Sequence, residues 1–143
     1  MNIESNLGSL LGKSSRLLAN HLNNRLNSIN LTVEQWSLLA LLWINDNQSQ
    51  KSLQLALLKD KATINSLINY LLKDGFVTKN PSTIDKRSLI VSLTQKGRKI
   101  QSASMPMAIK SIEQATENID KQELQITLKV LNQIISNLTK DKK

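Results

Sequence analysis

The chain has 143 residues, enough for one domain with its own core, and 40% of them are hydrophobic although only 3% are aromatic. Its 19 Lys and Arg residues outnumber 11 Asp and Glu residues, so the formal net charge is +8 and we expect an anionic partner. Cysteine is absent and no stretch approaches the roughly 18 apolar residues of a membrane span, which excludes disulfides, thiolate metal sites and a spanning helix.

An amphipathic helix is predicted over residues 3–29, where leucine and isoleucine recur at steps of three and four residues. The first residues lack the basic start and apolar run of a secretory leader, so we expect a cytoplasmic protein with no membrane partner. A second helix is predicted after Thr32, because Thr32 and Gln35 have the spacing of a capping box. The polar residues 45–48 end it.

Two short helices follow in close succession. Ser49 is expected to cap the first, which runs to about Leu58. Asp60 is expected to cap the second, which runs to Asp74 and stops at Gly75. Two short helices joined by a tight turn are typical of a helix-turn-helix.

The residue pattern changes after Gly75 from a helical period to alternation. Strands are predicted over residues 76–79 and 88–93, and the loop of residues 80–87 between them contains turn formers. This hairpin is the predicted wing. A long helix then begins at Thr94 and is interrupted or kinked at Pro106, and Asp120 with Glu123 opens the last helix.

This order of elements predicts a mainly α fold with a single domain over residues 1–143. A winged helix-turn-helix with a two-stranded β-wing occupies residues 32–94, and helices at 1–30 and 96–143 flank it. The flanking helices carry apolar stripes that a winged segment of about 55 residues cannot cover alone. Either they fold over it or they pair with a second chain, and we favour dimerisation, because it also pairs two DNA-binding units.

The helix from Lys61 to Asp74 carries the clearest functional signal. One of its faces is apolar, and the opposite face has short, uncharged residues flanked by Thr63 and Lys73, namely Ala62, Asn65, Ser66 and Asn69. Solvated helices usually carry Lys and Glu there, whereas short polar residues suit a helix in the DNA major groove, where Asn bonds adenine. An Asn-rich surface helix with no such role is the alternative.

The predicted wing adds positive charge. Lys79, Lys86 and Arg87 bracket its loop, where they can reach phosphates or enter a narrow minor groove. Asp85 can orient the guanidinium of Arg87 through an ion pair. A plain turn residue at Asp85 and a solvated Arg87 are the alternative.

A series of segments connects these features, running from residues 49–51 through 59–63 and 71–77 to Asp85-Lys86-Arg87, and closing on Leu93-Thr94 and Gly97. The series resembles the MarR family of bacterial regulators. The resemblance implies a homodimeric winged helix-turn-helix protein that binds pseudo-palindromic double-stranded promoter DNA, commonly as a repressor. The predicted DNA contacts are the residues at the matching positions together with Lys79 and Lys86 of the wing. They are Ser49, Lys51, Lys61, Ala62, Thr63, Asn65, Ser66, Asn69, Lys79, Asp85, Lys86 and Arg87.

Three positions depart from the family pattern. Gln54 stands where alanine is usual, Ser66 where arginine is frequent, and Tyr70 where a basic residue is common. The bases that are bound therefore cannot be carried over from relatives. The resemblance also implies a cleft for a small aromatic effector, formed here by Arg16, Trp36 and Leu39, although tryptophans at helical spacing equally suit a core.

Other classes of function have less support. His21 is the only histidine, and no motif for catalysis or phosphate binding is found, so we expect no metal site, no cofactor and no enzyme. The main alternative is a winged-helix protein-interaction module, an anti-repressor or co-regulator, which the missing arginine at Ser66 favours. A binder of RNA or membrane surfaces that uses only the positive charge is a further alternative.

Overall fold

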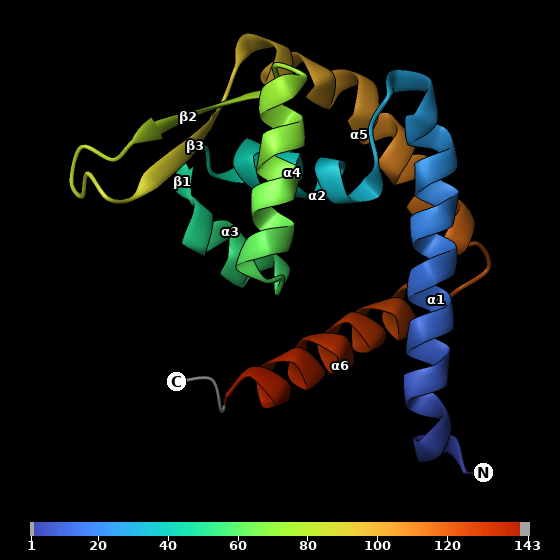
Figure 1. Ribbon diagram of the computed structural model, residues 1–143. Coiled ribbons are helices and arrows are strands. Elements are labelled where there is room, and N and C mark those ends of the chain that lie inside the picture. The colour runs from blue at the N-terminus through green and yellow to red at the C-terminus, as the bar shows by residue number, and fades with distance from the viewer. Residues whose placement is uncertain (1, 141–143) are drawn as a thin grey trace. The chain divides into compact units, whose positions relative to one another are not determined.

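The computed structural model describes residues 2–140 (Figure 1). By internal contacts the chain divides into two compact units, residues 1–111 and 112–143, and the boundary falls within α5. The elements in chain order are α1 (Ile3–Leu26), the 3-10 turn η1 (Asn27–Ile29), α2 (Val33–Ile44), β1 (Gln48–Ser49), α3 (Gln50–Leu57), α4 (Lys61–Lys73), β2 (Val77–Pro81), β3 (Leu89–Leu93), α5 (Gln95–Ala115) and α6 (Lys121–Thr139).

Side-chain caps fix where several helices begin, as the sequence predicted. At α2 the N–H of Gln35 donates to the Thr32 hydroxyl (3.1 Å), and the Thr32 N–H donates to the Gln35 side chain (3.0 Å), which completes a capping box. Ser49, Asp60 and Asp120 cap α3, α4 and α6 in the same way, each accepting from the N–H three residues later.

The turn between α3 and α4 depends on a left-handed residue. Leu58 has φ 52° and ψ 46°, and the next N–H, that of Lys59, donates to the carbonyl of Gln54. Leucine adopts this conformation at a cost, so the sequence did not predict it. Gly75, with φ 80°, ends α4 as predicted, and the Phe76 N–H then donates to the carbonyl of Leu71.

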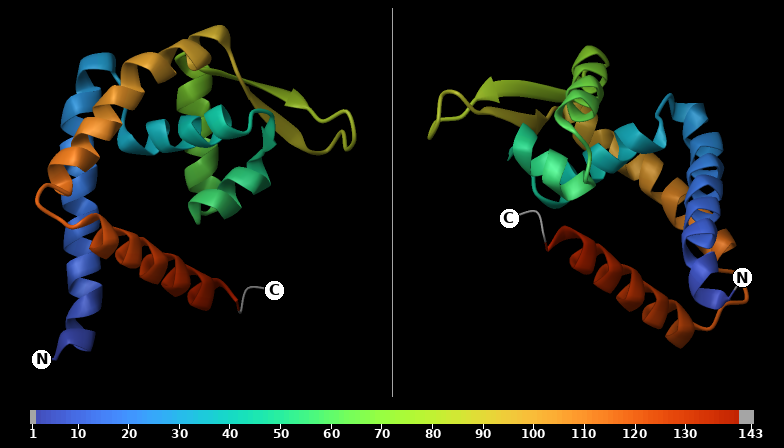
Figure 2. Two further views of the ribbon diagram at one scale, coloured as in Figure 1. Left: turned by 180° about the vertical axis from the view of Figure 1, so that it is seen from behind. Right: turned by 60° about the horizontal axis from the view of Figure 1, so that its bottom comes forward.

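The predicted hairpin is confirmed, with β2 and β3 paired antiparallel from Val77 opposite Leu93 to Pro81 opposite Leu89. Figure 2 shows this hairpin projecting beyond α3 and α4 in both views. A third strand, β1, pairs with β3 on its other side, giving the order β1-β3-β2. The predicted two-stranded wing is therefore part of a three-stranded sheet. The sequence did not predict β1, because a strand of two residues shows no detectable alternation.

Two predicted boundaries at the flanking helices also change. The predicted helix over residues 3–29 ends at Leu26 and closes with η1. The predicted interruption at Pro106 is not observed, since α5 continues through that residue to Ala115. None of the helices in residues 2–140 is long and apolar enough to cross a membrane.

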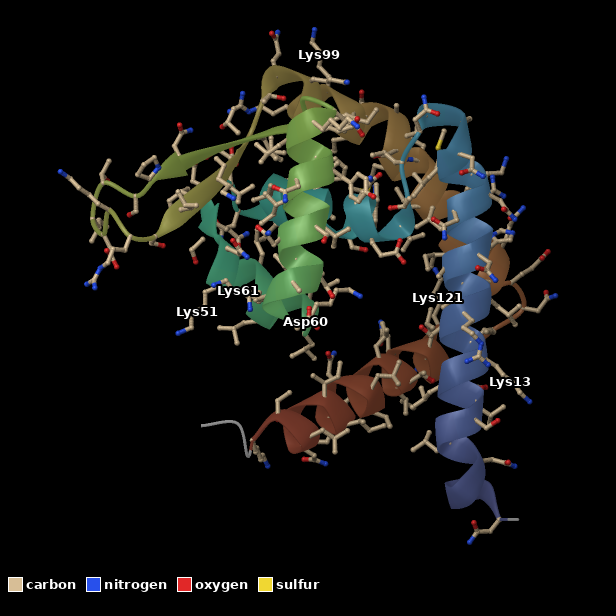
Figure 3. All side chains as sticks on the ribbon, viewed as in Figure 1. Lys13, Lys51, Asp60, Lys61, Lys99 and Lys121 are labelled. Atoms are coloured by element: carbon tan, nitrogen blue, oxygen red, sulfur yellow. The ribbon has the colours of Figure 1, made fainter. Side chains whose placement is uncertain are left out.

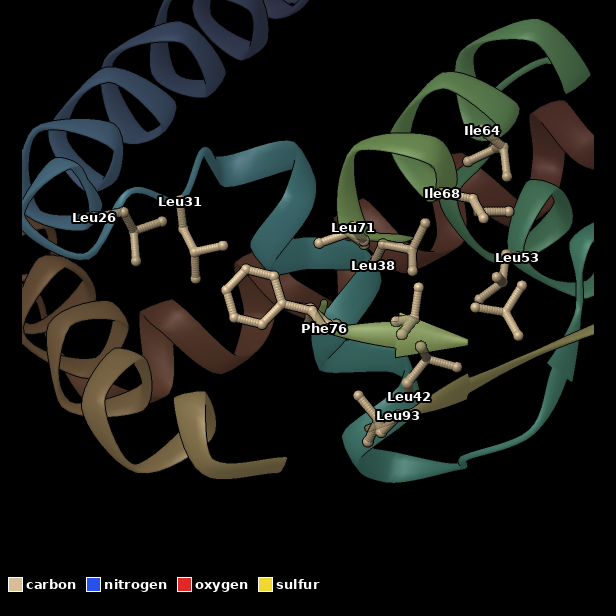
Figure 4. Packing of buried hydrophobic residues seen from close by; sticks show 13 residues of the cluster. Leu26, Leu31, Leu38, Leu42, Leu53, Ile64, Ile68, Leu71, Phe76 and Leu93 are labelled. Carbon is tan, nitrogen blue, oxygen red and sulfur yellow. The ribbon is translucent and has the colours of Figure 1, made fainter. Parts of the chain in front are cut away.

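The core of residues 1–111 is built mainly from leucine and isoleucine and places α4 against α2, α3 and the sheet (Figure 4). On α4, Ile64, Ile68 and Leu71 are fully buried. Their burial fixes the rotation of α4 about its own axis. The face with Asn65 and Asn69 is therefore turned to the outside.

Two tryptophans attach α2 to α5. The indole N–H of Trp43 donates to the carbonyl of Gly97 (2.9 Å), and that of Trp36 donates to the buried hydroxyl of Ser104 (3.1 Å). Their rings meet edge to face, with centroids 6.1 Å apart. Both rings therefore have a structural role between these helices.

Candidate nucleic-acid interface

The outer face of α4 is a row of short side chains. Ala62, Asn65, Ser66 and Asn69 are all exposed, as the sequence predicted. Within residues 2–140, no other group bonds the side chains of Asn65, Ser66 or Asn69. The two amides are therefore available to bond an external partner.

The first turn of α4 is stabilised by Asp60. Its carboxylate accepts the Thr63 N–H at 2.7 Å. The hydroxyl of Thr63, followed by this N–H, lowers the pKa of the Asp60 carboxyl below its ordinary value. The Thr63 hydroxyl thus takes part in capping, which limits its use as a contact to a partner. Lys61 is exposed beside it.

α3 packs against α4, and the end of α3 leads into the turn before α4. Ser49 caps α3 by accepting the Ser52 N–H at 3.1 Å, so its hydroxyl is already engaged. Lys51 is exposed on the same first turn, and Figure 3 shows it near the start of α4, where Asp60 and Lys61 lie.

Hydrogen bonds shape the wing loop, residues 82–88. The Ser82 N–H donates to the carbonyl of Ser88 (2.8 Å), and the Ser88 N–H donates to that of Asp85 (2.9 Å). The expected pair between Asp85 and Arg87 forms at 3.7 Å, and the carboxylate also accepts the Arg87 N–H at 3.0 Å. The Arg87 side chain is 95% exposed, so this pair orients it without burying it.

The remaining wing cations are placed differently. Lys86 is exposed in the loop next to Arg87. Lys79 is half-buried in the middle of β2, an edge strand, opposite Val91, so it does not belong to the loop.

Positive charge is concentrated around these elements. Residues 49–99 hold ten basic and three acidic side chains, a net charge of +7 out of +8 for the whole chain. Residues 112–143 hold five of each kind. The charge that favours an anionic partner therefore lies in the segment with α3, α4 and the wing.

The three residues predicted to contact an effector differ in burial, and the effector cleft stays a prediction. Leu39 is fully buried in the core, Trp36 is half-buried and bonded to Ser104, and Arg16 is exposed on α1. A shallow surface pocket lies on the first turns of α5 and is lined by Gln95, Lys96, Lys99 and Ile100. Within residues 2–140 no three His, Asp or Glu side chains gather as they would around a metal ion.

The structure adds exposed residues that the sequence had not singled out as contacts. Tyr70 is 59% exposed on α4, and Ile84 is 97% exposed in the wing loop. Hydropathy predicts burial for both residue types, so only their position in the fold identifies them. Lys59 is exposed in the turn before α4, and its positive charge could have identified it as a contact from the sequence.

Comparisons with known proteins agree with this fold. Residues 22–103 match the family described as "Transcriptional regulator SarA/Rot". The chain is also similar to the organic hydroperoxide resistance transcriptional regulator of Bacillus subtilis strain 168, with 31% identity over 97 residues, 68% of this chain and 66% of that protein. The chain thus spans slightly less than two thirds of that relative's length.

Two solved structures extend the similarity to nearly the whole chain. A MarR protein from Peptoclostridium difficile DA00132 has a TM-score of 0.88 and 26% identity, covering 96% of this chain and 90% of its own. The structure of reduced AbfR bound to DNA has a TM-score of 0.82 and 25% identity, covering 96% and 95%. The family match spans more than half of the chain, from the end of α1 through the wing into α5. The chain therefore belongs to the SarA/Rot family of transcriptional regulators and has the winged helix-turn-helix fold of MarR proteins.

Proposed function

We propose that this protein is a homodimer that binds pseudo-palindromic sites in double-stranded DNA and represses the promoters that contain them. The observation that carries the proposal is the outer face of α4, where Asn65, Ser66 and Asn69 are exposed and unbonded within the described chain. An Asn amide donates to and accepts from one adenine edge in the major groove, which lets such a helix distinguish bases.

Three elements supply contacts to one half-site. In the proposal, α4 is the recognition helix and lies in the major groove, Lys51 contacts phosphates beside it, and Arg87 enters the adjacent minor groove. All three belong to the unit of residues 1–111 and are joined by its core. The similarity to a structure that holds DNA supports this arrangement.

The homodimer is supported by apolar side chains that one copy leaves exposed. On α1, Leu17 is 69% exposed, and Leu7 and Leu10 are exposed as well. On α6, Leu138 is 74% exposed, with further exposed residues at Ile126, Leu128, Val130 and Ile135. Apolar area of this extent is typical of a protein interface, and a second copy would bring two recognition helices about 34 Å apart, one turn of DNA.

Release of the DNA by a small aromatic effector stays a prediction. The half-buried Trp36 provides a probe for effector binding, because a ligand beside an indole ring changes the fluorescence of the tryptophan. Titration with simple phenols tests this part of the proposal separately. An effector must change both the emission and the amount of DNA retained, since a ligand acts only through different affinities for two states.

The proposal is tested with the full chain and with DNA enriched by the protein from a random library. We expect retention that falls steeply with salt, because bound cations release counterions from DNA. Asn65→Ala should weaken binding to the enriched sequence by about 1–3 kcal/mol and relax the base preference at one position in each half-site. Asn45→Ala, which removes an exposed asparagine side chain at the end of α2, is the matched control and should bind as the wild type does.

Three outcomes would contradict the proposal. Failure to enrich any sequence over competitor would favour the protein-interaction module. Equal losses of affinity for all sequences in Asn65→Ala would remove α4 from base recognition. Light scattering at the concentrations used for binding must give twice the mass of one chain, or the homodimer is wrong.

A further inference from the structure

Ile84 is the most exposed large apolar side chain of the described residues, at 97%, and it lies in the wing loop. Single exposed apolar residues are common on protein surfaces and usually need no explanation. Ile84 differs from such residues in its surroundings, because Lys86 and Arg87 follow it within three positions. Its place on an element that projects from the helices gives any partner of the wing direct access to it (Figure 2).

The loop holds Ile84 in this position through its own hydrogen bonds. The Ser82 hydroxyl accepts the N–H of Ile84 (3.1 Å) and that of Asp85 (3.3 Å). The bond from the Ser82 N–H to the Ser88 carbonyl closes the loop behind them. A contact made by Ile84 therefore orders little additional backbone, which favours its use in binding.

The neighbouring charges limit what the partner of this side chain can be. Lys86 and Arg87 attract an anionic surface, while Ile84 requires an apolar one within a few ångströms of it. The minor groove of DNA combines the two, because phosphates border walls formed by deoxyribose carbons, and other minor-groove proteins insert isoleucine or leucine there. A surface of phosphate alone would leave Ile84 without an apolar contact.

We propose that Ile84 packs against the sugar walls of the minor groove when the wing binds DNA and that it contributes to specificity for A·T pairs there. The inference rests on the proposed function and adds a contact that charge alone does not provide. Guanine places an amino group on the floor of the minor groove, and that group would obstruct the isoleucine.

Salt dependence separates an apolar contact from an ionic one. Against the enriched duplex, Ile84→Ala should weaken binding five- to tenfold with an unchanged slope of log affinity against log salt. Arg87→Ala should weaken binding and lower the magnitude of the slope by about one. Ile44→Ala is the matched control, because Ile44 is 83% exposed at the end of α2, and it should bind as the wild type does.

A modified duplex locates the contact. Replacing adenine by 2,6-diaminopurine in the flanking A·T pairs adds an amino group to the minor groove and leaves the major groove unchanged. It should weaken wild-type binding more than it weakens binding by Ile84→Ala, because Arg87 enters the same groove in both proteins. The inference is wrong if Ile84→Ala binds the duplex with wild-type affinity, or if its loss of affinity comes with a changed salt slope. In either case Arg87→Ala still tests whether the wing binds DNA. Failure to enrich any DNA would instead overturn the proposed function.

Discussion

Gly97, in the first turn of α5, lies against the backbone of Phe76, which connects α4 to β2. A Cβ atom at this position would overlap the carbonyl oxygen of Phe76, and it would lie 3.1 Å from both the Phe76 carbonyl carbon and Leu93 Cδ2. Two of these three atoms belong to the backbone, so they cannot turn away as the end of a flexible side chain does. Gly97→Ala therefore forces α5 and the residues after α4 apart.

The size of the effect follows from the bonds at this joint. The Phe76 carbonyl accepts the Thr94 N–H (3.0 Å), the Gly75 carbonyl accepts the Thr94 hydroxyl (2.6 Å), and the Asp74 carbonyl accepts Lys96 Nζ (2.6 Å). Separating the elements by roughly 1 Å breaks or weakens these bonds, each worth about 1 kcal/mol net. Overpacking adds about 1–3 kcal/mol, and the better helix propensity of alanine offsets about 1 kcal/mol. We expect a net loss of about 3 kcal/mol.

Urea denaturation followed by tryptophan fluorescence measures this loss. It is carried out at one protein concentration, because dimerisation would make stability concentration-dependent. Gly8→Ala is the matched control, since a Cβ at Gly8 meets nothing within 4 Å. It should leave the free energy of unfolding unchanged or raise it by up to about 1 kcal/mol. If Gly97→Ala is as stable as Gly8→Ala, the steric argument is wrong.

Two further predictions concern the turn of the helix-turn-helix, between α3 and α4. Leu58→Gly should raise the free energy of unfolding by about 0.5 kcal/mol, because relief of the left-handed conformation outweighs the added entropy of the unfolded chain. A lower free energy of unfolding in urea denaturation would contradict this. Asp60 has a lowered pKa in the folded state, so its stabilising effect is present above about pH 3.9 and is lost as pH falls through the lower folded pKa. Asp60→Asn keeps a cap without titration, and its melting temperature should therefore fall less than that of the wild type between pH 5 and pH 2. Parallel curves would exclude Asp60 from the acid response.

The features predicted correctly from the sequence are those with local causes. A capping residue and its N–H partner are three positions apart, so Thr32, Ser49 and Asp60 identified helix starts without knowledge of the fold. Alternation identified the strands of the hairpin for the same reason. The exposed face of α4 also followed from local spacing, because the buried residues Ile64, Ile68 and Leu71 repeat at helical steps.

The features that could not be predicted depend on segments distant in sequence. β1 exists because Gln48 and Ser49 pair with Ile90 and Val91, some forty residues later. Asp46 supports this pairing by accepting the Leu93 N–H at 2.9 Å, a role that its place in a polar run did not indicate. Hydropathy alone would have placed Ile84 inside the protein, and only the closed wing loop holds it outside.

The distribution of charge also separates the two kinds of contact that we propose. Residues 49–99 carry nearly all of the net charge, whereas residues 112–143 are neutral and contain the exposed apolar residues of α6. Salt screens interactions between exposed charges and leaves apolar burial intact or strengthens it. Rising salt should then weaken binding through the wing and α4 while a pairing surface on α6 keeps its affinity. The proposed DNA binding and the proposed pairing through α6 should therefore respond differently to the same change of salt.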